Sequence, residues 1–269
     1  MAGKTRIAVS GAAGRMGARL VALTLEDPEL ELVAALESAG HPATGQDAGL
    51  LAGLGRECGI KVGARLAAKA DCIVDFSSPE GALVRLEEAV AAGIPLVSGT
   101  TGLSPDQKAR FDAAAGKIPL VLAPNMSVGA NLLFKLTGDA ARALGAGYDI
   151  EVVEAHHHHK ADAPSGTALR LAAAAADARG LDLAEHAVHG RSGRPGARRR
   201  DEIGIHAVRA GDIIGEHTVI FATGGERLEL IHRVSSRDGF CAGALRAAKF
   251  LAGKPPGAYS MARVLGLKE

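Results

Sequence analysis

The residues with the clearest chemistry lie between Glu154 and Thr167. This stretch holds four consecutive histidines, His156 to His159, followed directly by Lys160. The triplet Ser165-Gly166-Thr167 then precedes an alanine-rich run. Imidazoles exchange protons near neutral pH, and an ammonium group forms strong charge-assisted bonds with carboxylates. This combination indicates a site that grips an acidic small molecule and protonates it.

The four histidines cannot all share one role, because side chains alternate in direction along an extended chain. In that geometry His156 and His158 point one way, whereas His157 and His159 point the other. We expect His158 and His159 to be structural or solvated. Imidazoles at alternate positions can also bind zinc. The ammonium of Lys160 would repel a dication, however, and no metal site is predicted.

The Ser165-Gly166-Thr167 triplet follows Pro164 at the expected start of a helix. Exposed N–H groups, two hydroxyls and the helix dipole suit a carboxylate. The dipole alone contributes only ~0.3–1 kcal/mol, so firm binding requires a full charge such as Lys160. Capping of the helix by Ser165 is an alternative role, and it is compatible with ligand binding.

The elements that must position these residues form two patterns. Over the first 125 residues, short apolar strands at 6–10, 30–36, 73–76, 94–98 and 118–122 alternate with helices at 16–26, 79–92 and one beginning at Ser104-Pro105. Continuous apolar strands between helices predict a parallel sheet covered on both faces, which is a Rossmann-type doubly wound α/β fold. The Gly- and Ala-rich segment 41–63 is predicted to be a surface loop.

The pattern changes from Ser127 onward. A long helix at 128–144, a strand at 149–154, a helix at 167–179 and a Gly/Arg-rich loop at 190–200 precede strands at 203–208, 217–222 and 227–232. Their alternation predicts a mixed or antiparallel sheet with one wet face. The last helix, 240–251, resembles those of the first half. We therefore predict one domain of residues 1–126 and 237–269, and a second, α+β domain of residues 127–236.

A glycine-rich turn, Gly11-Ala12-Ala13-Gly14-Arg15-Met16-Gly17, follows the first strand and opens the first helix. Its glycines allow close approach of a pyrophosphate, to which the helix N-terminus offers N–H groups. The spacing is looser than the usual G-x-G-x-x-G, so a plain turn is the alternative. The second strand ends at Glu37, where an acid that binds ribose is expected.

Cofactor preference follows from Glu37 and its neighbours. Its carboxylate suits the ribose diol of NADH and repels a 2′-phosphate. Ser38 beside it carries no positive charge, and only Arg15 or a distant lysine would offset the repulsion. We expect NADH to be accepted at least as well as NADPH.

Two further junctions fall at the carboxyl ends of predicted strands, where doubly wound sheets bind ligands. One is Gly99-Thr100-Thr101-Gly102 and the other is Ala123-Pro124-Asn125-Met126. We predict that Gly99, Thr100, Thr101, Ala123, Pro124, Asn125 and Met126 line a nicotinamide pocket. Turn formation alone is the alternative for both.

Composition limits the remaining classes. A formal net charge of +1 and the absence of Trp argue against a nucleic-acid partner. No apolar run reaches the ~20 residues of a membrane span. Three scattered cysteines fit a reducing compartment, and the N-terminus enters a strand without a signal peptide. We expect a cytoplasmic protein.

The chain resembles the dihydrodipicolinate reductases (4-hydroxy-tetrahydrodipicolinate reductases) of lysine and diaminopimelate biosynthesis over nearly its whole length. The most specific part of the likeness is the stretch from Glu154 to Thr167. Supporting segments are Gly11–Gly17, Glu37, Gly99–Gly102, Asn125–Gly129 and Gly211–Thr218.

This resemblance implies a homotetramer whose second domain binds substrate and carries the subunit contacts. It implies hydride transfer from NADH or NADPH to a cyclic imine dicarboxylate, giving tetrahydrodipicolinate. By position, His156 matches the general acid and Lys160 the catalytic, carboxylate-binding lysine. His157, Gly166 and Thr167 match substrate contacts, and Ser165 belongs to the same predicted clamp. His158 stands where members often have Arg, and Ser38 replaces the Arg found in some members.

Two alternatives remain at this point. One is an aspartate- or semialdehyde-type dehydrogenase on the same fold, which can require a thiol nucleophile. The other is a nucleotide-sensing module without catalysis.

Overall fold

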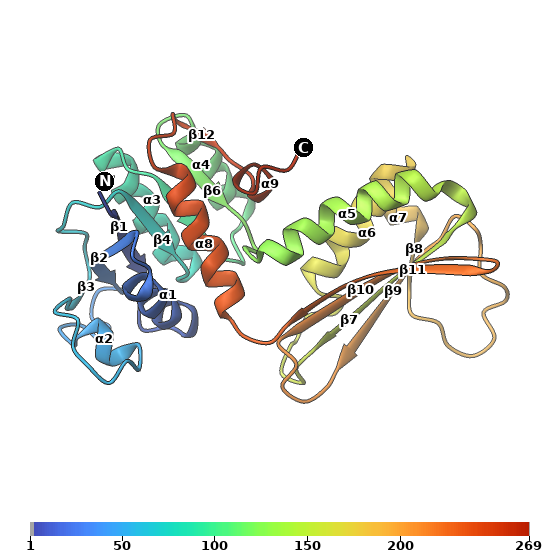
Figure 1. Ribbon diagram of the computed structural model, residues 1–269, viewed down its shortest axis with the longest axis horizontal. Helices are drawn as coiled ribbons and strands as arrows, with labels where there is room; N and C mark the ends of the chain where they lie inside the picture. The colour runs from blue at the N-terminus through green and yellow to red at the C-terminus, as the bar shows by residue number, and fades with distance from the viewer. Residues whose placement is uncertain (1–2, 269) are drawn as a thin grey trace. The chain divides into compact units, whose positions relative to one another are not determined.

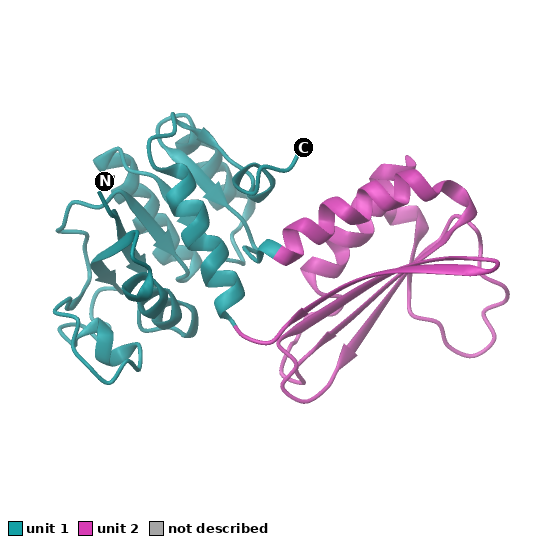
Figure 2. Ribbon diagram, in the orientation of Figure 1, with its two compact units in different colours: residues 1–128, 237–269 teal, residues 129–236 magenta. Residues whose placement is uncertain are grey.

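A computed structural model describes residues 3–268, and the chain divides into two compact units. Unit 1 comprises the residues up to Val128 together with those from Arg237 onward, and unit 2 is Gly129–Ser236 (Figure 2). The sequence predicted the same discontinuous arrangement, with the first boundary after Met126.

Unit 1 contains a parallel seven-stranded sheet in the order β12-β6-β5-β4-β1-β2-β3 (Figure 1). The strands are β1 (Thr5–Ser10), β2 (Leu30–Leu36), β3 (Val62–Gly63), β4 (Cys72–Asp75), β5 (Leu96–Ser98), β6 (Pro119–Leu122) and β12 (Gly257–Ala258). The sheet order reverses beside β1, because β2 pairs on one side of it and β4 on the other. Such a reversal is where doubly wound sheets bind ligands.

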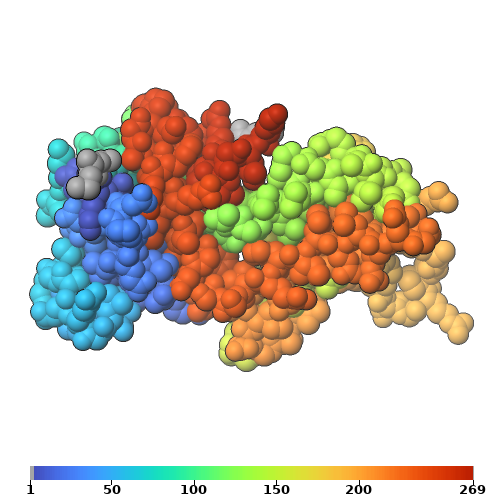
Figure 3. Space-filling model, in the orientation of Figure 1, coloured from blue at the N-terminus to red at the C-terminus, as the bar shows by residue number. Residues whose placement is uncertain are grey.

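Helices cover both faces of this sheet. One core joins the sheet to α1 (Arg15–Glu26), α8 (Asp238–Leu251) and α9 (Met261–Val264), and a second joins it to α3 (Pro79–Ala92) and α4 (Pro105–Ala115). Helix α8 therefore packs beside α1 although the two are far apart in sequence, and Figure 3 shows this red segment against the blue one. The predicted Rossmann-type fold is confirmed.

Local signals set the helix boundaries. Ser78 caps α3, whose first residue is Pro79, and Gly93 ends that helix at φ 64°. At α4, Ser104 and Gln107 form the capping box expected from the sequence. The bounds predicted for elements of unit 1 agree with the observed ones within two residues, whereas β3, β12, α9 and a short helix before β3 were not predicted.

The predicted surface loop at 41–63 is only partly correct. It contains α2 (Ala48–Leu51) and ends in β3. Asp47, 2% exposed, organises it by accepting hydrogen bonds from the N–H groups of Gly49, Leu50, Cys58 and Gly59. These bonds, led by that of Cys58, lower the pKa of Asp47 to about 2. Periodicity cannot reveal order that one buried carboxylate imposes.

Unit 2 contains a five-stranded mixed sheet in the order β11-β10-β7-β9-β8. Its strands are β7 (Asp149–His156), β8 (Ala187–His189), β9 (Ile203–Arg209), β10 (Gly215–Thr223) and β11 (Glu226–Val234). One face packs on α5 (Val128–Leu144) and α6 (Gly166–Arg179) around a single core. Two short helical segments complete the unit, η1 (Gly145–Gly147) and α7 (Leu183–His186). Among residues 3–268, no helix is long and apolar enough to cross a membrane.

Candidate active site

The glycine loop, residues Gly11–Gly17, is shaped by backbone contacts that leave no room for a side chain at Gly11 or Gly17. Gly11 has a φ of 74°, and a Cβ there would lie 2.5 Å from the carbonyl oxygen of Phe76. A Cβ on Gly17 would lie 1.9 Å from the Gly11 oxygen, which also accepts the N–H of Gly14 at 2.9 Å. The loop thus brings β1, α1 and the end of β4 together, leaving a cradle of the kind that takes a pyrophosphate.

Glu37, the acid predicted to bind ribose, lies against this loop. Its Oε1 accepts the N–H of Ala13 at 2.8 Å, which leaves the second oxygen for a ligand. Gly11, Ala13, Gly14 and Glu37 together line a cavity of about 820 Å³. Its size and its glycine cradle fit a dinucleotide.

The same cavity is lined by residues to which the sequence analysis gave no role: His41, Arg65, Phe76, Ser77, Ser78 and Arg85. Phe76 to Ser78 follow directly on β4, at the ligand-binding edge of the sheet. Their position after a predicted strand could have identified them as candidate cofactor contacts from the sequence. Arg65 is exposed, whereas Arg85 is buried and bonded to Glu88 and the carbonyl of Ala64.

The two predicted nicotinamide junctions follow β5 and β6. Thr100 is buried and donates its hydroxyl to the wholly buried Asp75 at 2.7 Å. Gly99 packs against the ring of Phe76, where a Cβ would lie 2.3 Å from a ring carbon. The other predicted cofactor residues differ in exposure. Ala12, Ala123 and Met126 are buried, and Met16 and Asn125 are half-buried. Arg15, Thr101 and Pro124 are exposed.

The histidines of unit 2 depart from the predicted alternation after the first one. β7 extends to His156, but residues 157–160 form a turn closed by the Lys160 N–H on the His157 carbonyl. The prediction that His157 and His159 share one direction opposite to His158 is therefore wrong. The ring of His159 lies 3.7 Å from that of His158 and 6.3 Å from that of His157, between ring centroids. His158 is exposed, and its Nδ1 lies 2.9 Å from the carbonyl oxygen of Gly211.

His156 stands at the end of β7 with a side chain 12% exposed. Its Nδ1 lies 2.6 Å from Oε2 of Glu154, a carboxylate with no exposed surface. Both carboxylate oxygens of Glu154 also accept amino groups of Arg209, each at 2.8 Å. Sheet register explains this meeting, because Arg209 on β9 is the direct partner of His156.

Ser165 and His217 are buried next to Glu154 and His156. The Ser165 N–H donates to Glu154, and its hydroxyl accepts the N–H of Ala168, so Ser165 caps α6. The same hydroxyl lies 3.1 Å from Nε2 of His217. Burial, followed by the nearby His156, lowers the pKa of His217 to about 4.

Lys160 lies in the turn, 22% exposed, and pairs with Asp162 at 2.8 Å. Gly166, at the first position of α6, is exposed, and Thr167 beside it is half-buried. The structure thus brings His156, Ser165 and the start of α6 into one cluster with Glu154, Arg209 and His217. Among residues 3–268, no group of three or more His, Cys, Asp and Glu side chains could hold a metal ion.

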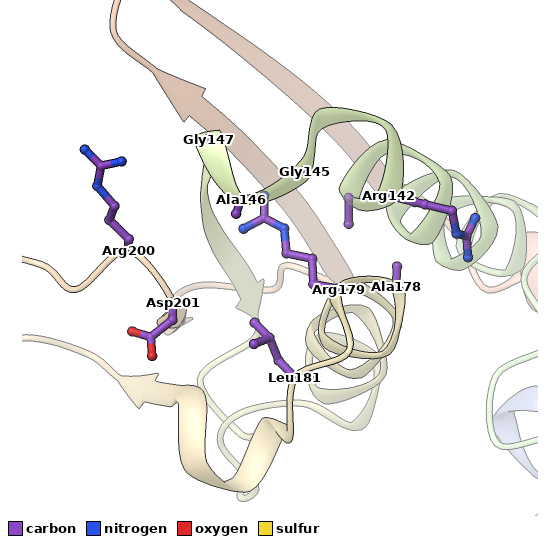
Figure 4. A pocket seen from close by; sticks show the side chains of 10 residues that line it. Arg142, Gly145, Ala146, Gly147, Ala178, Arg179, Leu181, Arg200 and Asp201 are labelled. Carbon is purple, nitrogen blue, oxygen red and sulfur yellow. The ribbon is translucent and has the colours of Figure 1, made fainter.

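Unit 2 contains a cavity of about 470 Å³, which lies away from the cluster around His156. It is lined by the C-terminal ends of α5 and α6 with η1, and Figure 4 shows Arg142 and Arg200 extending away from Arg179. Ser165 caps the opposite end of α6, about 20 Å away at 1.5 Å per residue. Within residues 3–268, the lining of this cavity includes none of the predicted site residues.

The fold and the cluster define a two-unit oxidoreductase with a Rossmann-type nucleotide unit. The family described as "Dihydrodipicolinate reductase, N-terminus" matches residues 5–126, and the one described as "Dihydrodipicolinate reductase, C-terminus" matches residues 129–265. The chain belongs to the dihydrodipicolinate reductase family. The resemblance read from the sequence is confirmed, and with it the prediction of an enzyme.

Curated relatives match over nearly the full length. The 4-hydroxy-tetrahydrodipicolinate reductase of Alkalilimnicola ehrlichii is 55% identical, over 98% of this chain and 99% of its own. That of Anaeromyxobacter dehalogenans is 51% identical, over 98% of each chain.

Solved structures agree on the fold. A dipicolinate-bound dihydrodipicolinate reductase from Paenisporosarcina sp. TG-14 superposes with a TM-score of 0.73 at 25% identity, covering 96% of this chain and 97% of that one. An aspartate semialdehyde dehydrogenase from Vibrio cholerae has a TM-score of 0.53 at 12% identity, covering 92% of this chain and 98% of that one. This second likeness is one of fold alone.

Proposed function

We propose that the chain reduces 4-hydroxy-tetrahydrodipicolinate, a cyclic imine dicarboxylate, to tetrahydrodipicolinate with NADH or NADPH. The observation that carries the proposal is the cluster of His156, Glu154 and the α6 start, with Lys160 in the adjoining turn, in a chain about half identical to reductases of this name. Loss of water from the substrate leaves a conjugated imine. Hydride added at C4 and a proton added at the other end then give the product.

The bound nicotinamide supplies the hydride, and the chain itself must supply the proton. His156 is the proton donor in this proposal, because it is a partly exposed imidazole backed by a buried carboxylate. An imidazole titrates close to neutral pH, which suits a general acid.

Lys160 and His157 hold one substrate carboxylate in this proposal. The present partner of Lys160 is Asp162, whose side chain is 63% exposed. A substrate carboxylate can therefore displace Asp162 into water and keep the ammonium paired. Charge-assisted bonds of this type contribute about 1.5–3 kcal/mol.

The start of α6 holds the other carboxylate. Ser165 contributes by capping the helix, since its N–H and hydroxyl are bonded to Glu154, Ala168 and His217. The exposed Gly166 and the half-buried Thr167 then face the ligand, where the helix dipole favours an anion.

The cofactor binds in the 820 Å³ cavity of unit 1, with its pyrophosphate on residues Gly11 to Met16 and its ribose on Glu37. We propose that NADH serves at least as well as NADPH, because the Glu37 carboxylate opposes a 2′-phosphate. Arg65 and His41 line the same cavity and give NADPH a compensating attraction.

We also propose a cytoplasmic homotetramer assembled through unit 2. The sheet face opposite α5 and α6 carries exposed apolar side chains, Val208 at 45% and Ile231 at 46%. A second sheet can cover such a face. The three cysteines form no disulfide, as in proteins of a reducing compartment.

Two of the three thiols do not suit the semialdehyde dehydrogenase alternative. Cys72 and Cys241 are wholly buried, and burial raises the pKa of Cys241 to about 12 and that of Cys72 further. A nucleophilic cysteine requires a lowered pKa and exposure. The nucleotide-sensing alternative leaves the acid cluster of unit 2 unexplained.

The test follows NADH absorbance with and without the imine dicarboxylate, in the wild type and in His156→Gln. We expect wild-type turnover and a kcat about 10³-fold lower in the variant, with NADH binding unchanged. His158→Gln is the control and should turn over normally. Unaltered turnover in His156→Gln would remove this residue from the acid role, and no oxidation by the wild type would refute the activity.

A further inference from the structure

Glu154 is a wholly buried carboxylate on which three elements converge. His156 Nδ1 lies 2.6 Å from one oxygen, and the Ser165 N–H donates to the other at 3.0 Å. Two amino groups of Arg209 donate at 2.8 Å, one to each oxygen. Glu154 lies behind His156 and makes no direct contact with the substrate in the proposed function.

These contacts keep Glu154 ionised. Burial acts to raise the pKa of Glu154, but the bonds from Arg209, His156 and the Ser165 N–H outweigh it and hold the pKa below its usual value. An ionised carboxylate can only accept hydrogen bonds. The Nδ1 atom of His156 must therefore carry a hydrogen.

The other ring nitrogen of His156 is left for the substrate. Nε2 faces Gly215, where a Cβ would come within 3.1 Å of it. Glycine at this position leaves the space beside Nε2 open.

We propose that Glu154, clamped by Arg209, is a positioning residue that fixes the tautomer of His156 and stabilises its imidazolium, making Nε2 the proton donor. The inference rests on the proposed role of His156. In the step, the Nε2–H bond breaks, the proton goes to the end of the imine remote from the hydride, and a neutral imidazole remains with hydrogen on Nδ1. The arrangement is the one by which a buried carboxylate orients a catalytic histidine.

The bond between His156 Nδ1 and Glu154 is the interaction that stabilises the imidazolium, because the other charged groups nearby are already paired or neutral. Arg209 offsets the charge of Glu154 and keeps it from taking the proton itself. Lys160 is paired with Asp162. His217, whose ring centroid is 5.2 Å from that of His156, stays uncharged at neutral pH because its pKa is about 4.

Two further histidines lie nearby: His157 on the adjoining turn, which the charge of His156 reaches, and His232 on β11, which is the strand partner of His217. Burial lowers the pKa of each, so both favour the neutral form.

The first test is Glu154→Gln, which keeps the shape and removes the charge. A general acid works in its protonated form, so activity falls as pH rises through its pKa. Loss of the anion removes the charge that stabilises the imidazolium of His156. We expect kcat to fall about 100-fold and its alkaline limb to move to lower pH, with KM for the imine and NADH affinity within about twofold.

Glu151→Gln is the matched control. Glu151 lies on the same strand and is bonded by Arg191, Arg198 and His206, without contact to His156. Its loss should leave the alkaline limb in place. An equal shift in both variants would overturn the proposal.

A second variant separates positioning from structural support, because Glu154→Gln leaves the Arg209 guanidinium without its partner. Glu154→Gln combined with Arg209→Met removes both charges. We expect the double variant to show the same displaced limb. Recovery of the wild-type limb would mean that Glu154 serves only to anchor Arg209.

The tautomer itself can be measured in the wild type by ¹⁵N NMR of the histidines, with the His156 signals assigned from His156→Gln. Neutral His156 should carry hydrogen on Nδ1, and hydrogen on Nε2 would overturn the proposal. This readout needs no turnover. A protein that failed the reductase assay yet showed the Nδ1–H form would refute the proposed function and leave this inference standing.

Discussion

The two candidate sites are built from different materials. In unit 1 the glycine loop is defined by backbone atoms, and its shape depends on missing side chains: a Cβ on Gly17 would lie 1.9 Å from a carbonyl oxygen. In unit 2 the site is defined by side-chain charges, with a wholly buried Glu154 held between Arg209 and His156. The unit 1 site therefore depends on the absence of side chains at its glycines, whereas the unit 2 site depends on paired charges.

This difference determines how each site should respond to change. A backbone cradle should fail when volume is added and should be insensitive to pH. A charged cluster should tolerate small changes of volume but respond to the loss of one charge or to acid, because burial makes an unpaired charge costly. The following predictions test this contrast.

Among the tests of this contrast, the largest expected effect is that of Lys160→Ala in unit 2. Removing the ammonium removes the proposed partner of a substrate carboxylate, a bond of about 1.5–3 kcal/mol. We expect kcat/KM for the imine to fall about 100-fold, with both kcat and KM affected. Steady-state kinetics measures this. Lys135→Ala removes a similar ion pair, with Asp139 on α5, and should change kcat/KM less than twofold. Equal losses in the two variants would contradict a specific role for Lys160.

Volume is the corresponding probe of unit 1. Gly17→Ala places a methyl group against the backbone of Gly11, which cannot rotate away. We expect the free energy of unfolding to fall by about 2–3 kcal/mol and NADH affinity to fall with it. Urea unfolding and NADH titration measure the two effects.

Gly116→Ala is the control for Gly17→Ala, since a Cβ there meets its nearest neighbour at an ordinary 3.6 Å and φ is −71°. A Gly17→Ala protein as stable as this control would show that the loop can give way.

The same contrast explains how far the sequence predicted the sites. The glycine loop and Glu37 were predictable because their signal is local, a spacing that follows one strand and an acid that ends the next. The capping box at Ser104 and Gln107 was predictable for the same reason.

Arg209 and His217 were missed because their partners are distant in sequence. Sheet register sets Arg209 opposite His156 and His217 opposite Glu154, and strand periodicity carries no register information between β7, β9 and β10. The direction of the last three histidines was lost for a related reason. Alternation holds only while the chain is extended, and β7 ends at His156.

Acid should weaken unit 2 through His217. Its pKa is about 4 in the folded chain and about 6.5 in an unfolded one, so the unfolded state binds more protons between these values. Stability therefore falls as pH falls through that window. Between pH 7 and pH 5 we expect wild type to lose roughly 1–2 kcal/mol more than His217→Gln.

Urea unfolding at both pH values measures the difference between wild type and His217→Gln. His157 and His232, whose pKa values are also lowered, are present in both proteins and cancel. Identical losses in the two proteins would mean that His217 titrates normally when folded.

The smallest expected effect is that of Arg65→Ala. It tests whether side-chain charge contributes to cofactor binding in unit 1. This side chain is exposed and lines the nucleotide cavity together with Glu37. An exposed ion pair contributes about 0.2–1 kcal/mol, so Arg65→Ala should raise KM for NADPH about threefold and leave KM for NADH unchanged. Lys69→Ala, which removes an exposed cation outside the cavity lining, should change neither. A rise in both KM values would mean that Arg65 contacts a part common to the two cofactors, and that side-chain charge helps to build this site as well.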